Sequence, residues 1–436
     1  MVEKRSTVNI VTLGCSKNKV DSEVLGAQLH AMGFDVVHDS EKKSNFVVIN
    51  TCGFIGDAKE ESVDTILSYA SLRKRGKIAR LVVMGCLSER YKKDLEREIH
   101  EVDAFYGVND QSLIPALFKL DAPRPEPSNS CQSVRILSTP SHYAYLKISE
   151  GCDRSCAFCA IPGIRGRHIS RTIESLVKEA AELANAGVKE IILIAQELTY
   201  YGIDLHGKRM LPELIAQLSQ IEGIEWIRLQ YAYPQQFPDE LTRVIADNPK
   251  VCKYIDLPLQ HISTNVLDSM RRNITREKTI ELVKKIRASV PEIAFRTTFI
   301  TGFPTETEDD FEELYQFVKE SRFDRVGVFT YSHEEDTPAF QLNDVVPEAI
   351  KQERMEKLMT LQQDISLEIN ESKIGRVERV IIDKIEGEYY VGRTQYDSPE
   401  VDNEVLIPAG IEMEPGKFYN VEITAAAHFD LYAKVI

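Results

Sequence analysis

Gly151-Cys152-Asp153-Arg154-Ser155-Cys156-Ala157-Phe158-Cys159 is the stretch that decides how this sequence of 436 residues folds. Its three cysteines lie four and three residues apart, directly after an alternating apolar run at 143–149. Thiolates are the usual ligands of iron–sulfur clusters. A tight loop with three of them can bind three corners of a cubane cluster and leave one iron open to another ligand. The stretch therefore predicts a three-thiolate iron–sulfur site.

A zinc knuckle and three unpaired core cysteines are the structural alternatives for the same stretch. Zinc sites usually show paired Cys-x-x-Cys arms or a histidine at short range. Here the Cys-x-x-Cys pair is the second half of the triplet, and no cysteine follows nearby. The spacing therefore favours the iron–sulfur interpretation.

The motif resembles the signature of the radical S-adenosylmethionine (SAM) enzymes, Cys-x-x-x-Cys-x-x-Cys with an aromatic residue before the last cysteine. Phe158 fills that aromatic place. The resemblance implies a [4Fe–4S] cluster held by Cys152, Cys156 and Cys159, with SAM chelated by the open iron. It also implies reductive cleavage of SAM to a 5′-deoxyadenosyl radical.

The bulk composition is that of a globular chain with several domains. The length suggests about three domains, and the hydrophobic fraction of 43% is ordinary. No apolar run approaches the length of a membrane span, and the strand-like run at 8–13 leaves no room for a signal peptide. Eight cysteines in such a chain indicate metal or redox chemistry rather than a disulfide framework. We expect a cytoplasmic protein that does not enter a membrane.

Three apolar runs in the first 120 residues each end in a cysteine. The runs are 8–15, 46–52 and 81–86, and helix-like stretches at 21–32 and 57–72 separate them. Strands that alternate with helices predict a parallel sheet, whose carboxyl ends lie on one edge. Residues 1–120 are therefore predicted to form a parallel α/β domain.

Cys15, Cys52 and Cys86 then fall on the same edge of that sheet, where open α/β sheets bind ligands. Buried cysteines at strand ends are common, which is the structural alternative. Each has a small neighbour that lets the backbone approach a bulky ligand: Gly14, Gly53 and Gly85. Three such thiols on one edge predict a second three-thiolate cluster.

The amino-terminal motifs narrow the resemblance to the methylthiotransferases, a radical-SAM branch with such a cysteine-bearing first domain. The matching motifs are Thr12-Leu13-Gly14-Cys15, Asn50-Thr51-Cys52 and Met84-Gly85-Cys86. The resemblance implies an auxiliary [4Fe–4S] cluster at Cys15, Cys52 and Cys86 that delivers sulfur or a methylthio group. A second SAM would supply the methyl group, and no side chain is expected to act as a catalytic residue itself.

A proline-rich linker is predicted at 121–140, with Cys131 incidental. From 141 to 372, six strand-like runs alternate with helical stretches, which predicts a partial (β/α)6 radical-SAM barrel with an open side. The runs are 143–149, 190–195, 224–229, 253–257, 295–301 and 325–331.

Active residues of such barrels gather at the carboxyl ends of the strands. The resemblance implies that Gln196 and Glu197 hold the methionine amine of SAM, and that Thr298 and Gly302 lie where SAM ribose and adenine bind. An ordinary surface loop is the alternative for the first pair. The arginines of Met270-Arg271-Arg272 could meet a carboxylate or phosphate, or they could be solvated charges at a helix end.

Five short strand-like runs at 373–436 predict a small antiparallel β-barrel of the OB-like kind. The family has a TRAM domain here, which is generally an RNA-binding module. This domain carries 7 Lys and Arg against 12 Asp and Glu, and the whole chain has a formal net charge of −15. The loop with Asp397, Glu400, Asp402 and Glu404 would repel RNA. It is either a solvated face or a surface for a very basic protein.

Two branches of the family matter here: one modifies a tRNA adenosine beside the anticodon, and the other modifies an aspartate of the twelfth small-subunit ribosomal protein. The acidic last domain and residues 256–263 resemble the second branch. It implies methylthiolation of the aspartate β-carbon, a basic ribosomal protein bound through the acidic TRAM domain, an electron donor such as a flavodoxin or ferredoxin, and a monomer. A tRNA enzyme would need a basic track. A non-catalytic electron carrier would close its cluster with a fourth thiolate.

Overall fold

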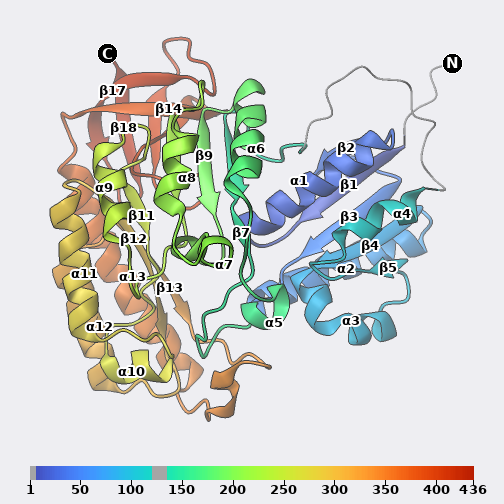
Figure 1. Ribbon diagram of the computed structural model, residues 1–436, viewed down its shortest axis with the longest axis horizontal. Coiled ribbons are helices and arrows are strands. Elements are labelled where there is room, and N and C mark those ends of the chain that lie inside the picture. The colour runs from blue at the N-terminus through green and yellow to red at the C-terminus, as the bar shows by residue number, and fades with distance from the viewer. Residues whose placement is uncertain (1–5, 120–134) are drawn as a thin grey trace. The chain divides into compact units, whose positions relative to one another are not determined.

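The computed structural model describes residues 6–119 and 135–436, which divide into two compact units (Figure 1). The first unit holds the residues up to Thr139 together with 150–153 and 159–168. The second holds 140–149, 154–158 and 169–436. Cys131 and most of the predicted linker lie outside the described residues. Within the described ranges, no helix is long and apolar enough to cross a membrane.

The first unit is built on a five-stranded parallel sheet, as predicted for the amino-terminal domain. Its order is β2-β1-β3-β4-β5, and each neighbouring pair runs parallel. The strands are β1 (Thr7–Thr12), β2 (Asp35–His38), β3 (Phe46–Thr51), β4 (Arg80–Gly85) and β5 (Ala104–Phe105). The short strands β2 and β5 at the two edges were not among the predicted runs.

Helices cover both faces of this sheet, so its central strands are apolar at nearly every position. Residues alternate between the faces: Val8 and Val82 pack on one side with α1 and α4, whereas Val47 and Val83 pack on the other with α2 and α3. The helices are α1 (Ser16–Ala31), α2 (Gly56–Lys74), α3 (Cys86–Glu98) and α4 (Ile114–Phe118). Helix α1 begins five residues before its predicted start, because its first turn is polar and buried rather than apolar.

The second unit contains the six predicted parallel strands in two sheets of three, ordered β6-β9-β10 and β11-β12-β13. A parallel bridge between Ile227 and Val251 lies between the two sheets. The strands are β6 (Tyr143–Lys147), β9 (Glu190–Ile194), β10 (Trp226–Leu229), β11 (Tyr254–Asp256), β12 (Ala294–Thr301) and β13 (Arg325–Thr330). This arrangement agrees with a partial barrel.

Helices connect the barrel strands, and α13 leads from the last of them to the small barrel (Figure 1). The longer ones are α6 (Ile173–Asn185), α8 (Leu211–Leu218), α9 (Asp239–Asp247), α11 (Arg276–Ser289), α12 (Glu308–Ser321) and α13 (Glu348–Glu371). The remaining short elements are β7 (Ser149–Glu150), α5 (Ile161–Arg165), β8 (Ile169–Ser170), α7 (Ile203–His206), α10 (Thr264–Ser269) and 3-10 turns at Gln111–Leu113, Leu198–Tyr200 and Pro338–Gln341.

The last five strands close into a small barrel in the order β14-β15-β16-β18-β17. Its pairs are antiparallel except for β16 with β18, which run parallel. The strands are β14 (Val377–Glu386), β15 (Tyr389–Thr394), β16 (Glu404–Pro408), β17 (Phe418–Ala426) and β18 (Asp430–Val435). The predicted OB-like barrel is therefore present, with one parallel closure.

The acidic loop at 397–404 is not the solvated face that its composition suggests. Asp397 is fully buried and accepts hydrogen bonds from Arg325 and Thr394. The Asp402 carboxylate accepts from the Tyr254 hydroxyl at 2.7 Å and from Arg296 Nε at 3.2 Å. Burial alone would raise the pKa of Asp397, but Arg325 and Lys373 hold it below its usual value. These two carboxylates attach the small barrel to β11, β12 and β13 rather than facing a partner.

A buried ion network joins β9, β10 and the small barrel. Glu190 is fully buried, and its carboxylate lies 2.6 Å from Arg228 Nε and 2.8 Å from Arg393 Nη2. Burial alone would raise the pKa of Glu190, but the two guanidinium groups lower it below its usual value. Arg393 also holds Asp383 through Nε at 2.6 Å. The network orders the junction only while every charge keeps its partner.

The Glu190→Gln variant is expected to lose about 3–5 kcal/mol of unfolding free energy, since it leaves buried guanidinium charge uncompensated. Urea unfolding followed by fluorescence reports on this junction directly, because the single tryptophan, Trp226, packs edge-on to Phe418 at 4.8 Å. The matched control is Glu213→Gln, which removes a solvent-exposed pair with Lys208 and should cost less than about 1 kcal/mol. Equal midpoints for the two variants would contradict a structural role for the network.

Candidate metal centres

The three amino-terminal thiols lie where parallel strands end, as the sequence predicts. Cys15 directly precedes α1, Cys52 directly follows β3, and Cys86 begins α3 after β4. They range from exposed Cys15 through half-buried Cys52 to buried Cys86. Gly14 has a φ of +86°, and a Cβ there would lie 2.7 Å from the Cβ of Cys52. Only glycine lets the backbone pass so close to the thiol.

A buried arginine that sequence reasoning missed accompanies these thiols. Arg165 in α5 donates to Asn18 Oδ1 at 2.6 Å and pairs with Asp21 at 3.1 Å. Burial raises the pKa of the Cys86 thiol to about 12, and the Arg165 charge acts against that rise. Burial likewise raises the pKa of Cys52. Arg165 is thus a cation that partly offsets the effect of burial on the pKa of Cys52 and Cys86.

Asn18 fixes the backbone around the same edge. Its side-chain amide donates to the carbonyl oxygens of Leu13 at 2.8 Å and Thr51 at 3.1 Å, so it links two of the cysteine-bearing turns. The polar first turn of α1 explains why Asn18 escaped the sequence prediction, which searched for apolar periodicity. The sequence feature that could have identified Asn18 is its position, three residues after Cys15 in a turn without an apolar face.

The loop at 151–160 contributes residues to both units. In the first unit, Gly151 has a φ of +74°, and a Cβ there would lie 2.1 Å from the carbonyl oxygen of Arg167. The Cys152 amide donates to the Gly166 carbonyl at 3.1 Å, and Asp153 accepts from Arg167 Nε at 2.8 Å. Backbone and side chain together therefore fix the start of the loop.

In the second unit, Cys156 is buried, and two polar groups contact its sulfur. Arg272 Nη1 donates to Cys156 Sγ at 3.4 Å, and the Tyr233 hydroxyl lies 3.5 Å from the same atom. The guanidinium carbons of Arg272 and Arg154 lie 4.2 and 4.3 Å from the centre of the Tyr233 ring, within the range of cation–π contacts. Arg272 is only 4% exposed, so it is not a solvated charge.

The two cysteine triplets supply the type of ligand that iron–sulfur clusters require. Across residues 6–119 and 135–436, no three Cys, His, Asp or Glu side chains stand together in positions that hold a metal ion. The ligand type nonetheless matches, since three thiols belong to each loop or edge and thiolates are the required donors. Cys252, the seventh described cysteine, is buried among apolar side chains such as Trp226 and Tyr254, as expected for a core residue. It offers no fourth ligand.

The residues predicted to contact SAM lie at the carboxyl ends of β9 and β12. Glu197 follows β9, is buried, and accepts from Arg154 Nη2 at 2.8 Å and from the Thr199 hydroxyl. Gln196 beside it is partly exposed. Phe158 packs against the apolar cluster that includes Phe303.

On β12, Thr298 is partly buried, and its carbonyl accepts from the Gln260 amide at 2.8 Å. Gly302 has a φ of +73°, and a Cβ there would lie 2.2 Å from Cγ of Lys351. Its amide donates to Glu306 Oε2 at 2.8 Å. A glycine is therefore required at this strand end on both conformational and steric grounds.

Glu306 is a third residue that sequence reasoning missed. Its buried carboxylate holds the Gly302 amide, pairs with Arg354 at 2.7 Å and lies 3.5 Å from His261 Nε2. His261 is fully buried, and its Nδ1 accepts from the Ser263 amide at 3.0 Å, as expected for a structural histidine. Only the fold could have singled out Glu306, because Glu308 beside it is exposed at the same helix start.

The Arg272→Gln variant is expected to make the reduction potential of a cluster at Cys156 more negative. A cation that donates to a ligand sulfur favours the added electron, and a charged hydrogen bond of about 1.4 kcal/mol corresponds to about 60 mV for one electron. Redox titration followed by electron paramagnetic resonance measures the shift. Arg271→Gln, which changes the exposed neighbour, is the control. An unchanged potential in Arg272→Gln would show that the contact does not tune the site.

Comparison with known proteins defines the class of this chain. Residues 146–318 match the Radical SAM superfamily, residues 7–107 match Uncharacterized protein family UPF0004, and residues 374–436 match the TRAM domain. The solved structure of the radical S-adenosylmethionine methyltransferase TsrM from Kitasatospora setae shares the fold with a TM-score of 0.55 at 14% identity, over 87% of this chain and 79% of that one. The chain is therefore a radical-SAM protein by fold and motif.

Curated relatives give the family. The chain is 53% identical to "Ribosomal protein uS12 methylthiotransferase RimO" of Cytophaga hutchinsonii, over 99% of this chain and 98% of the relative. It is 55% identical to the protein of the same name from Phocaeicola vulgatus, over 99% of this chain and 100% of the relative. The chain belongs to the RimO family of methylthiotransferases, and as a member it is a radical-SAM transferase.

Proposed function

We propose that this protein adds a methylthio group to the β-carbon of an aspartate in ribosomal protein uS12. The observation that carries the proposal is the near full-length similarity, at 53–55% identity, to proteins named for that activity. The domain division 1–120, 121–140, 141–372 and 373–436 belongs to the same proposal. A protein that modifies a ribosomal protein would work in the cytoplasm, and we propose that it does so as a monomer.

Cys152, Cys156 and Cys159 would hold a [4Fe–4S] cluster that, with SAM bound, supplies one-electron chemistry able to remove a hydrogen atom from an unactivated carbon. The chain's own groups prepare that place. Arg272 and Tyr233 contact the Cys156 sulfur, at 3.4 and 3.5 Å. They orient the ligand and limit the access of water to it.

Of the residues that the sequence predicts at SAM, Gln196 is proposed to face the methionine part, and Thr298 and Gly302 the ribose and adenine. Gly302 has the best structural support, because its positive φ and the Lys351 side chain beside it both require a glycine at this strand end. Both Glu197 oxygens already accept hydrogen bonds, from Arg154 and Thr199. We therefore assign Glu197 to hold Arg154 in place, and Gln196 to meet the amine.

Cys15, Cys52 and Cys86 would hold the second [4Fe–4S] cluster, the proposed source of the transferred sulfur. Arg165 supplies positive charge beside these thiols and binds Asn18, which links two of their turns. The chain's task at this edge is to keep three thiolates together without a fourth ligand.

Asp397 and Asp402 of the acidic loop are turned into the protein. They therefore cannot bind a basic protein substrate. Exposed carboxylates remain on the small barrel, among them Glu388, Glu400 and Glu412. These suit a basic ribosomal protein and disfavour the phosphate backbone of tRNA.

The proposal is tested by anaerobic turnover with SAM and a strong reductant, offering small ribosomal subunits and bulk tRNA in parallel. Mass spectrometry should find a methylthio group on an aspartate of uS12 and none on tRNA. A methylthio-adenosine in tRNA with unmodified uS12 would overturn the substrate assignment.

A further inference from the structure

A strongly basic segment interrupts an otherwise acidic protein between Met270 and Arg287. It carries seven Lys and Arg against two Glu, whereas the whole chain has 53 basic and 68 acidic residues. The segment comprises the turn that follows α10 and most of α11. An excess of one charge on a surface of the opposite sign favours encounter with an oppositely charged partner.

Three of these cations are exposed without an ion pair among the described residues: Arg271, Lys278 and Lys284. The others have partners within the protein. Lys285 pairs with Asp239 at 2.6 Å, Arg276 lies 3.9 Å from Glu313, and Arg287 donates to the Ser321 and Arg322 carbonyls. The exposed three are therefore available to a partner, while the rest fix the surface.

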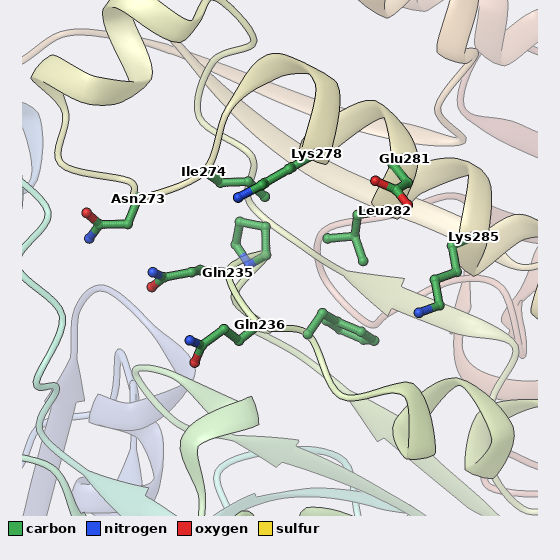
Figure 2. Close-up of a pocket in the computed structure, with 10 residues that line it drawn as sticks. Gln235, Gln236, Asn273, Ile274, Lys278, Glu281, Leu282 and Lys285 are labelled. Atoms are coloured by element: carbon green, nitrogen blue, oxygen red, sulfur yellow. The ribbon is translucent and has the colours of Figure 1, made fainter.

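A pocket of about 350 Å³ opens beside these cations. Figure 2 shows Lys278 reaching from α11 over the pocket, with Gln235 and Gln236 on the opposite side and Asn273 at one end. Three amide side chains and two ammonium groups, those of Lys278 and Lys285, line the cavity together with one carboxylate, that of Glu281. This excess of donors suits an incoming carboxylate, which accepts hydrogen bonds from both kinds of group. Ile274 and Leu282 provide an apolar floor for the stem of such a side chain.

The same segment contacts the cysteine loop within the second unit. The Met270 carbonyl accepts from the Ala157 amide at 2.9 Å, and Arg272 donates to Cys156 Sγ at 3.4 Å. On the pocket side, Gln235 accepts from Arg154 Nη1 at 3.0 Å. The pocket is therefore linked to the Cys156 sulfur by direct contacts, from Gln235 through Arg154 and Tyr233.

We propose that this basic surface docks an acidic, low-potential one-electron carrier protein, with an acidic side chain of the carrier seated in the pocket. The carrier loses one electron and the cluster proposed at Cys152, Cys156 and Cys159 gains it, with no bond made or broken. The inference rests on that proposed cluster. Three exposed cations beside one pocket are fewer than the extended basic track that RNA binding needs, so this surface favours an acidic protein over RNA.

The test uses the holoenzyme with two charge-reversal pairs. Lys278→Glu with Lys284→Glu changes the proposed surface. Lys178→Glu with Lys319→Glu makes the same change in net charge on α6 and α12, where both lysines are exposed and have no ion pair among the described residues. Binding of a purified flavodoxin is measured by anaerobic calorimetry at low salt. SAM cleavage is then compared with reduced flavodoxin and with dithionite as the reductant.

The Lys278/Lys284 pair should weaken flavodoxin binding by about tenfold or more and slow flavodoxin-driven cleavage, while dithionite-driven cleavage stays at the wild-type rate. The control pair should bind like the wild type. Equal affinity for all three proteins, or equal loss in both pairs, would overturn the proposal. Binding of ribosomal RNA is measured by the same calorimetry, and its loss in the Lys278/Lys284 pair with flavodoxin binding intact would overturn the proposal and assign the surface to RNA. Flavodoxin binding is measured without any methylthiolation substrate, so the substrate assignment can fail independently.

Discussion

The combined Cys152→Ala, Cys156→Ala and Cys159→Ala variant is expected to lose SAM cleavage by at least about 1000-fold. These thiols are the proposed ligands of the cluster that reduces SAM, and no described cysteine can replace them. Methylthiolation should be lost with it, because hydrogen abstraction precedes sulfur insertion. Anaerobic incubation with SAM and dithionite, followed by chromatography of 5′-deoxyadenosine, measures the effect.

Cys252→Ala is the matched control for this variant. It removes a buried cysteine that belongs to neither triplet. Its SAM cleavage should stay near the wild-type rate. Cleavage that survives in the triple variant would refute the assignment of the loop as the SAM-reducing site.

The combined Cys15→Ala, Cys52→Ala and Cys86→Ala variant is expected to separate SAM cleavage from methylthiolation. SAM cleavage should persist, since its proposed ligands are intact, while the methylthio product should fall below detection, at least about 1000-fold. Both products can be measured in one reaction with small ribosomal subunits as substrate. Methylthiolation at the wild-type level would show that sulfur does not come from this edge of the sheet.

Much of this architecture could be predicted because it depends on short-range patterns. Apolar runs that end in a cysteine mark β1, β3 and β4, and alternation with helices predicts their parallel order. The same reasoning anticipates the six barrel strands and the closed barrel at the carboxyl end. Both cysteine triplets are visible as spacing alone.

The burial of charged residues could not be predicted in the same way. An aspartate looks the same in the sequence whether its carboxylate faces solvent or a buried guanidinium group. Asp397 and Asp402 contribute to an acidic loop in sequence, yet Arg325 and Arg296 draw them inward. Those arginines lie on strands far away along the chain, so no local pattern reveals the pairing. The same holds for Arg165, whose partner Asn18 is 147 residues distant.

The basic segment between Met270 and Arg287 was visible in the sequence, but its place in the fold was not. Its charges are local in sequence, but only the fold shows that the turn before α11 contacts the loop of Cys156. Arg271 and Arg272 are neighbours in sequence, yet one is exposed and the other buried against a sulfur. Side-chain direction in a turn separates their roles.

The central claim is that this chain holds two separate three-thiolate clusters. The most direct measurement is the iron and acid-labile sulfide content of the anaerobically reconstituted wild type and of the two triple-alanine variants, with Cys252→Ala alongside. We expect each triple variant to retain about half the wild-type iron and sulfide, and Cys252→Ala to retain all of it. A wild type with no more iron than one of the triple variants would contradict the claim of two clusters.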